Sequence, residues 1–163
     1  MQHITDYRPK CLVELWGKPL LEWQLMALRA AGIDDIAIVT GYKRDKLAKY
    51  GLREFVNSRW AETNMVSSLE CAQQWLENFP CVVSYSDIYY EASAVTLLLD
   101  CAAPLAVTYD PHWRLLWEKQ FGNPLIDAET FRIGHDGALL DIGNTPRSLD
   151  EVQGQYMGPV SYT

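Results

Sequence analysis

Long apolar runs and an excess of positive charge are both missing from this sequence of 163 residues. A membrane-spanning helix needs about 18 or more consecutive apolar residues, and the sequence contains no such run. Lys and Arg number 14 against 21 Asp and Glu, so the formal net charge is -7, whereas nucleic-acid-binding surfaces are normally basic. We therefore expect neither a membrane nor a nucleic-acid partner.

Metal-binding patterns of cysteine and histidine are missing too. No two cysteines have CxxC spacing, and the histidines are scattered, so we expect no zinc site. The residues concerned are Cys11, Cys71, Cys81, Cys101, His3, His112 and His135. Free thiols are the usual state in a reducing cytoplasm. Because residues 1–10 are polar and lack the apolar stretch of a signal peptide, we expect a cytoplasmic protein.

What the sequence does contain is an alternation of apolar runs with helical patterns, which is typical of a βαβ sheet. Its length fits a single domain, residues 1–163. Strands are predicted at residues 11–15, 36–39, 52–56, 81–85, 105–109, 130–133, 139–142 and from 153 onward. Helices are predicted at residues 20–31, 43–50, 69–76, 93–101 and 113–120, the third of them capped by Ser67 or Ser68.

Ligands of an open α/β sheet bind beyond the carboxyl ends of its strands, where three loops qualify: residues 40–43, 57–68 and 86–91. Asp87 directly follows an apolar strand, so its carboxylate is expected at the sheet edge. There it could hold Mg²⁺, which takes one or two carboxylates plus substrate phosphates. It could equally cap the following turn or helix, and the residues alone leave both interpretations open.

Two further segments carry candidate binding groups. Arg8 and Lys10 flank Pro9 and could neutralise a triphosphate, although a solvated tail explains them as well. Residues 57–68 are rich in Asn, Ser and Thr, which could read a base edge or simply cap a loop. An aromatic set could form a cage for a quaternary ammonium group or serve as packing: Tyr85, Tyr89, Tyr90, Trp113 and Trp117.

Several motifs, in order, resemble those of sugar-phosphate nucleotidyltransferases. They are RPKCLVE at residues 8–14, GKPLLE at 17–22, AGIDDI at 31–36 and VTGY at 39–42. The run from Asn57 through Thr63 and Asn64 to Ser68, and then SYSDI at 84–88, is similar to the phosphocholine and phosphonate cytidylyltransferase branch. The resemblance covers nearly the whole chain. It implies a Rossmann-like α/β fold with three layers and a mostly parallel sheet, of the nucleotide-diphospho-sugar transferase type.

The resemblance also implies roles by position. Lys10 matches the lysine that contacts the NTP phosphates, and Asp87 matches the aspartate that holds Mg²⁺, the expected cofactor. Arg8, Asn57, Thr63, Asn64, Ser68 and Tyr85 are the candidate nucleotide- and substrate-binding residues. The implied partners are an NTP, with CTP preferred, and a small phosphorylated or phosphonate substrate. An oxygen of that substrate would attack the α-phosphorus of CTP, and pyrophosphate would leave.

The sequence departs from the family pattern at both ends. No Gly-rich LAAGxGxR loop precedes residue 1, and the chain stops before the position of a second metal-binding aspartate. We therefore expect a truncated domain, incomplete at both ends, with weak or no activity alone. A non-catalytic nucleotide- or metabolite-binding remnant and a sugar-phosphate nucleotidyltransferase stay open as alternatives. Phosphocholine, an aminoalkylphosphonate and a sugar phosphate are all possible acceptors.

Overall fold

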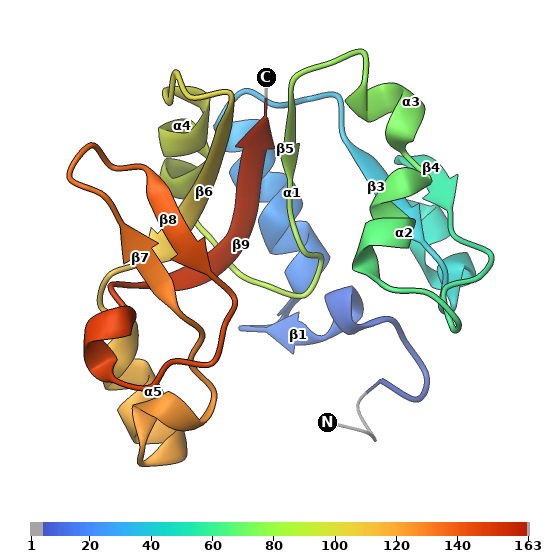
Figure 1. The fold of residues 1–163 in the computed structure, drawn as a ribbon. Coiled ribbons are helices and arrows are strands. Elements are labelled where there is room, and N and C mark those ends of the chain that lie inside the picture. The colour runs from blue at the N-terminus through green and yellow to red at the C-terminus, as the bar shows by residue number, and fades with distance from the viewer. Residues whose placement is uncertain (1–4, 163) are drawn as a thin grey trace. The chain divides into compact units, whose positions relative to one another are not determined.

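The computed structural model describes residues 5–162 of the chain (Figure 1). These residues form two compact units. Unit 1 is drawn from Met1–Ala106 and Pro159–Thr163, and unit 2 is Val107–Gly158. Strands β6 (Leu105–Asp110) and β9 (Gln155–Tyr162) run from one unit into the other. None of the described helices is long and apolar enough to cross a membrane.

The order of helices and strands follows the alternation in the sequence. The α-helices are α1 (Leu20–Ala30), α2 (Met65–Glu70), α3 (Gln73–Leu76), α4 (Ala92–Leu99) and α5 (Trp113–Phe121). The other strands are β1 (Glu14–Leu15), β2 (Lys18–Pro19), β3 (Ala37–Thr40), β4 (Arg53–Val56), β5 (Cys81–Val83), β7 (Phe131–Ile133) and β8 (Leu139–Ile142). Short 3₁₀ helices complete the set: η1 (Lys10–Leu12), η2 (Arg44–Tyr50), η3 (Pro124–Ile126) and η4 (Leu149–Glu151).

Strand pairing is mixed. β3 and β4 are parallel, with Ala37 opposite Arg53, while β1–β2 and β7–β8 are antiparallel hairpins. The third sheet has the order β5-β9-β6, and β9 runs antiparallel to β5, with Val83 opposite Val160. The α/β class is therefore confirmed. The sheet is less parallel than the resemblance implied, because the chain comes back through β9 in the opposite direction to β5.

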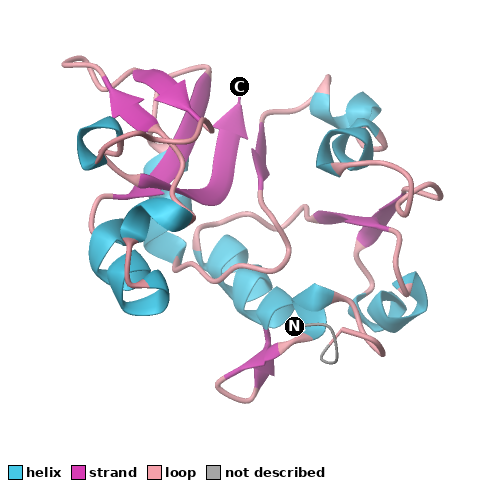
Figure 2. Cartoon of the chain, turned by 60° about the horizontal axis from the view of Figure 1, so that its bottom comes forward, coloured by secondary structure: helices cyan, strands magenta, loops and turns pink. Residues whose placement is uncertain are grey.

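Helix α1 joins two parts of the unit 1 core. Leu21 and Leu25 on one side pack in a cluster with Cys11, Leu12 and Leu47. A second cluster combines Ala27 of α1 with Tyr90 and with Val95 of α4. Full burial of a Leu or Val side chain contributes roughly 1.5–3 kcal/mol. Figure 2 shows α1 in cyan beside the magenta hairpin β1–β2 that precedes it in the chain. The apolar spacing that predicted this helix therefore marks its two buried sides.

The predicted strand at residues 11–15 is wrong over most of its length. Residues 10–12 form η1, held by bonds in which the amides of Leu12 and Val13 donate to the carbonyls of Pro9 and Lys10. Cys11 and Leu12 are both buried, and consecutive residues of a strand point to opposite faces. A tight helical turn lets both side chains reach the same core, and only Glu14–Leu15 remains a strand.

The predicted cap at Ser67 or Ser68 is also wrong. α2 begins at Met65, and its cap is Asn64, whose side-chain oxygen accepts bonds from the amides of Val66 and Ser67. The hydroxyl of Ser68 instead donates to the carbonyl of Asn64 inside the first turn. Asparagine is among the preferred N-cap residues, so the apolar pattern placed the start of this helix a few residues too late.

Unit 2 has its own core. Trp113 of α5 is buried with Ala128 and Val152, and its ring meets that of Trp117 at 6.0 Å, nearly perpendicular. Phe131 of β7 is among the most completely buried side chains and stacks on Tyr109 at 5.1 Å. These aromatic residues therefore serve as packing within unit 2.

Candidate active site

A hollow of about 410 Å³ lies in unit 1 beside the carboxyl end of β3. It receives residues from all three loops that the sequence marked as ligand-binding positions. Thr40, Gly41 and Tyr42 come from the first loop, Trp60 from the second and Ser86 from the third. The remaining lining is Thr5, Asp6, residues 9–11, Ile38, Val39 and Leu47. The predicted edge of the sheet is therefore where the hollow forms.

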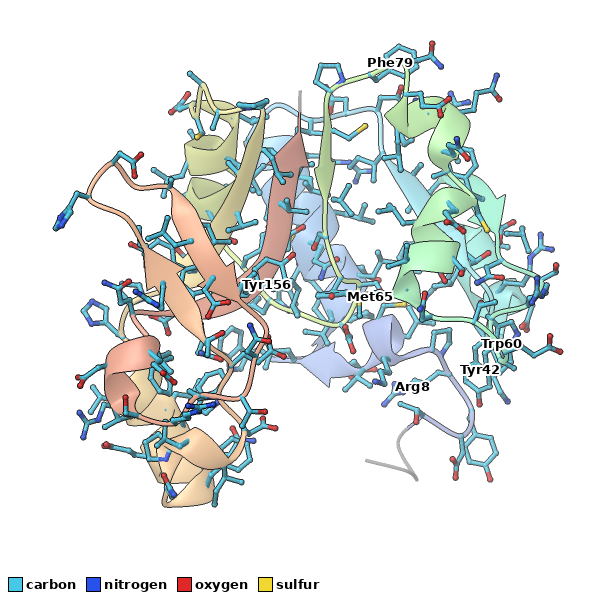
Figure 3. All side chains as sticks on the ribbon, viewed as in Figure 1. Arg8, Tyr42, Trp60, Met65, Phe79 and Tyr156 are labelled. Atoms are coloured by element: carbon cyan, nitrogen blue, oxygen red, sulfur yellow. The ribbon has the colours of Figure 1, made fainter. Side chains whose placement is uncertain are left out.

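One wall of the hollow depends on a glycine. A Cβ atom at Gly41 would lie 2.5 Å from the Cβ of Trp60, so the tryptophan rests directly on the backbone of residue 41. The ring of Trp60 also meets that of Tyr42 at 5.1 Å (Figure 3). The Tyr42 hydroxyl donates to the carbonyls of Thr5 and Asp6 at 3.0 and 3.1 Å. This wall ties the loop after β3 to the segment that leads into η1.

The two residues singled out for catalysis lie together. The Nζ atom of Lys10 is 3.7 Å from Oδ2 of Asp87. Both side chains are accessible, at 66% and 38% exposure. An exposed ion pair of this kind stabilises a fold by about 0–1 kcal/mol at most. The ion pair therefore adds little to the stability of the fold, and both charged groups are accessible to a ligand.

Cys11, which follows Lys10 in the chain, is buried and feels the charge of Asp87. Burial raises the pKa of Cys11 to about 11, with the negative charge of Asp87 acting in the same direction. The thiol is therefore protonated at neutral pH. Cys11 and Ser86 both line the hollow, together with the charged residues Asp6 and Lys10. Asp87 lies outside the lining and is connected to it through its ion pair with Lys10.

The candidate binding residues of the loop 57–68 are engaged with one another. Asn57 is buried, and its side-chain nitrogen donates to the hydroxyls of Thr63 and Ser68 at 2.9 and 3.0 Å. Its oxygen accepts a bond from the amide of Arg59. Asn64 caps α2. These contacts give each of the four predicted residues a task within the loop, which in turn presents Trp60 to the hollow.

Of the predicted site residues, Lys10 lines the hollow, and Arg8 and Tyr85 lie outside its lining, as do Asp87 and the four residues of the loop 57–68. Arg8 pairs with Glu14 at 3.5 Å, and the Tyr85 hydroxyl contacts the sulfur of Met65. The proposed aromatic cage divides between the units, and Tyr90 and Trp113 are buried core residues. Tyr89, a member of the predicted cage, instead meets two rings that the sequence did not single out, those of Trp16 and Trp23, at nearly right angles.

The donor set suits one kind of metal site. Among the described residues, no group of three or more His, Cys, Asp or Glu side chains is placed to hold an ion. An all-protein cage therefore does not fit. A lone carboxylate at Asp87 does fit Mg²⁺, which is typically held by one or two carboxylates together with substrate phosphates.

Comparison with known proteins identifies the family of this chain. The sequence matches the MobA-like NTP transferase domain over residues 5–145. It is 36% identical to the CTP:phosphoglutamine cytidylyltransferase of Campylobacter jejuni, covering 95% of this chain and 65% of that protein. It is 35% identical to the choline-phosphate cytidylyltransferase of Streptococcus pneumoniae, covering 48% of this chain and 36% of that protein. The chain thus spans less than two thirds of the length of these relatives.

Solved structures agree on the fold. The inositol-1-phosphate CTP transferase of T. maritima superposes with a TM-score of 0.76 at 14% identity, covering all of this chain and 65% of that one. The CTP:phosphocholine cytidylyltransferase of Streptococcus pneumoniae gives a TM-score of 0.62 at 24% identity, covering 99% and 64%. With the family match extending over most of the sequence, the chain belongs to the MobA-like NTP transferase domain family.

Proposed function

We propose that the protein transfers CMP from CTP to the phosphate or phosphonate group of a small molecule. An oxygen of the acceptor attacks the α-phosphorus of CTP, the bond to the bridging oxygen breaks, and pyrophosphate leaves. The observation that carries the proposal is the pair of accessible, opposite charges on Lys10 and Asp87, 3.7 Å apart beside the hollow.

Each member of the pair has a separate task. The ammonium group of Lys10 contacts the triphosphate and neutralises the charge that grows on the leaving oxygens. Asp87 holds Mg²⁺ together with the phosphates, and the bound ion supplies Lewis-acid stabilisation of phosphoryl oxygens. Neither residue forms a covalent intermediate. Catalysis on this scheme is alignment and charge neutralisation.

The relatives support the choice of substrates. Their names specify phosphoglutamine, choline phosphate and 2-aminoethylphosphonate as acceptors, with cytidylyl as the transferred group. All three acceptors carry a phosphoryl or phosphonyl group on a small nitrogen-containing molecule. We expect an acceptor of this class. The free thiols of the four cysteines support a cytoplasmic location.

The other candidate residues act at the border of the site. We expect Asn57, Thr63, Asn64 and Ser68 to act by fixing the loop that carries Trp60, since their hydrogen bonds are made inside that loop. Arg8 and Tyr85 lie outside the lining of the hollow, where a bound substrate can exchange their present partners for its own groups.

The test measures CTP binding and pyrophosphate release separately. Lys10→Met and Asp87→Asn should each weaken Mg²⁺-dependent CTP binding, and should lower any turnover by on the order of 100-fold. Lys46→Met and Asp45→Asn are matched controls, because this pair is also exposed and 3.8 Å apart but neither residue lines the hollow, whereas Lys10 does. CTP binding that survives both site variants would overturn the proposal. CTP binding without pyrophosphate release, when phosphoglutamine, choline phosphate and 2-aminoethylphosphonate are each supplied as acceptor, would favour the non-catalytic alternative.

A further inference from the structure

A buried glutamine of α1 reaches across to the loop that carries Asp87. Gln24 is only 5% exposed. Its Nε2 atom donates to the backbone carbonyl of Tyr85 at 2.8 Å and to that of Ile88 at 2.7 Å. The two carbonyls belong to residues 61 and 64 positions away along the chain. One side chain thus joins the first helix to the loop after β5.

The chemistry of the partners fixes the orientation of the amide. Backbone carbonyl oxygens only accept hydrogen bonds, so the nitrogen of Gln24, and not its oxygen, must face them. A side-chain amide nitrogen has two hydrogens, and each is used by one carbonyl. No other arrangement of this side chain would satisfy both bonds.

The two carbonyls lie on either side of Ser86 and Asp87. Holding residues 85 and 88 to one rigid helix leaves the two residues between them little freedom. Ile88 and Tyr90 add apolar anchors, because both pack in the cluster formed with Ala27 and Val95. The side chain of Asp87 itself stays accessible. The loop is therefore fixed through its backbone while its carboxylate faces solvent.

We propose that Gln24 is a positioning residue, which sets the backbone of the Asp87 loop so that the carboxylate meets the metal–nucleotide complex. This inference rests on the proposed function for the role of Asp87, and on the two hydrogen bonds for the role of Gln24. Side chains that orient metal ligands commonly change metal affinity by 10–100-fold when they are removed.

Gln24→Met tests the proposal, because methionine keeps the length of the side chain and removes both donors. The chain offers a matched control in Gln155, which is also buried and whose Nε2 donates to two carbonyls, those of Glu129 and Gly154, at 2.8 and 3.0 Å. Gln155→Met removes the same groups away from the Asp87 loop. Gln24→Asn is the second variant if Gln24→Met does not fold, since it keeps the amide but is one methylene too short.

We call the two hydrogen bonds by which Gln24 holds residues 85 and 88 the clamp. Two measurements test the clamp separately from the proposed function. The first is the NMR order parameter of the Ser86 and Asp87 amides, recorded without metal or nucleotide. The second is the affinity for Mn²⁺ in the presence of CTP. The Gln24 variants should lower the order parameters from values near 0.85 to below about 0.6 and weaken Mn²⁺ binding by on the order of 10-fold. Gln155→Met should change neither.

Each other outcome has a definite meaning. Unchanged order parameters in the Gln24 variants would overturn the clamp. A mobile loop with unchanged Mn²⁺ affinity would overturn the positioning role while leaving the clamp intact. If the wild-type chain binds no Mn²⁺ with CTP, the proposed function fails, and the order parameters still decide whether Gln24 holds the loop.

Discussion

Cys11 differs from the other three cysteines in being buried. It is buried and lines the hollow, whereas Cys71 and Cys101 are exposed. The thiolate is the reactive form of cysteine, and burial raises the pKa of Cys11 to about 11. Burial and protonation therefore both protect the Cys11 thiol from alkylating reagents.

We predict that iodoacetamide at pH 8 modifies Cys71 and Cys101 long before Cys11. Mass spectrometry of peptides at successive times measures the three rates in one sample. The exposed cysteines serve as internal controls for reagent activity. Modification of Cys11 at the rate of Cys71 in the folded protein would contradict the buried position.

The same thiol makes the stability of the fold vary with pH in the alkaline range. Its pKa rises from 9.0 to about 11 on folding, so the folded state binds this proton more tightly than the unfolded state. The contribution of this proton to the free energy of unfolding is fully present below pH 9 and is lost as the pH rises through 11. We predict that the free energy of unfolding of wild type falls over this range relative to that of Cys11→Ala. Urea titrations at each pH measure the difference, and parallel curves would argue against it.

At the scale of elements, the start of α2 depends on one side chain. Asn64 accepts bonds from two amides of the first turn, and replacing such a cap by alanine typically costs about 1 kcal/mol. We predict that Asn64→Ala lowers the free energy of unfolding by about this amount, measured by urea titration. Ser67→Ala, at the cap expected from sequence, should change it by less than about 0.5 kcal/mol. Equal effects of the two variants would speak against Asn64 as the cap.

A charged contact joins the parallel strands to η2. Arg44 donates two bonds to the carboxylate of Glu54, and the hydroxyl of Thr40 donates a third. The hydrogen bonds from Arg44 and then Thr40 lower the pKa of Glu54. Because the folded-state pKa is the lower one, this stabilisation is present at neutral pH and is lost as the pH falls through that value.

We predict that wild type is more stable than Glu54→Gln at pH 7 and that the difference disappears in acid. Thermal or urea unfolding from pH 7 to pH 3 measures it. Added salt should reduce the advantage at pH 7, since the pair is exposed. A difference that does not vary with pH would mean that the carboxylate charge is not responsible.

Most elements were predictable because their apolar spacing records which side is buried. Helix α1 and strand β3 follow their patterns to within a residue or two. Residues 10–12 were not predictable in this way, because the turn depends on Cys11 and Leu12 reaching one core that forms only in three dimensions. Short segments have too few positions for a period to show.

The candidate site divides in the same manner. Lys10 and Asp87 were found through motifs, and the structure brings them together. The role of Gln24 was not predicted, because a single polar residue among the apolar positions of a helix gives no sign of its partners. Trp60 and Gly41 were missed as a pair because their contact joins two loops. Contacts between loops leave no periodic signal in either one.

At the scale of the whole molecule, the chain forms two compact units, whereas the sequence predicts one domain. Strands β6 and β9 belong in part to each unit, so neither unit can lose its strands without disturbing the other. We predict a single unfolding transition. Hydrogen exchange of peptides from α4 in unit 1 and α5 in unit 2, followed with increasing urea, should report the same midpoint. Two separate midpoints would show that the units are independent domains.

The wall made by Trp60 on Gly41 has an optical consequence. Indole emission changes in colour and intensity when water around the ring is replaced, and Trp60 is 46% exposed at the hollow. On the proposed function, a nucleotide bound in the hollow would displace that water, so Trp60 would report its binding. Subtracting the spectrum of Trp60→Phe isolates this signal from the other five tryptophans.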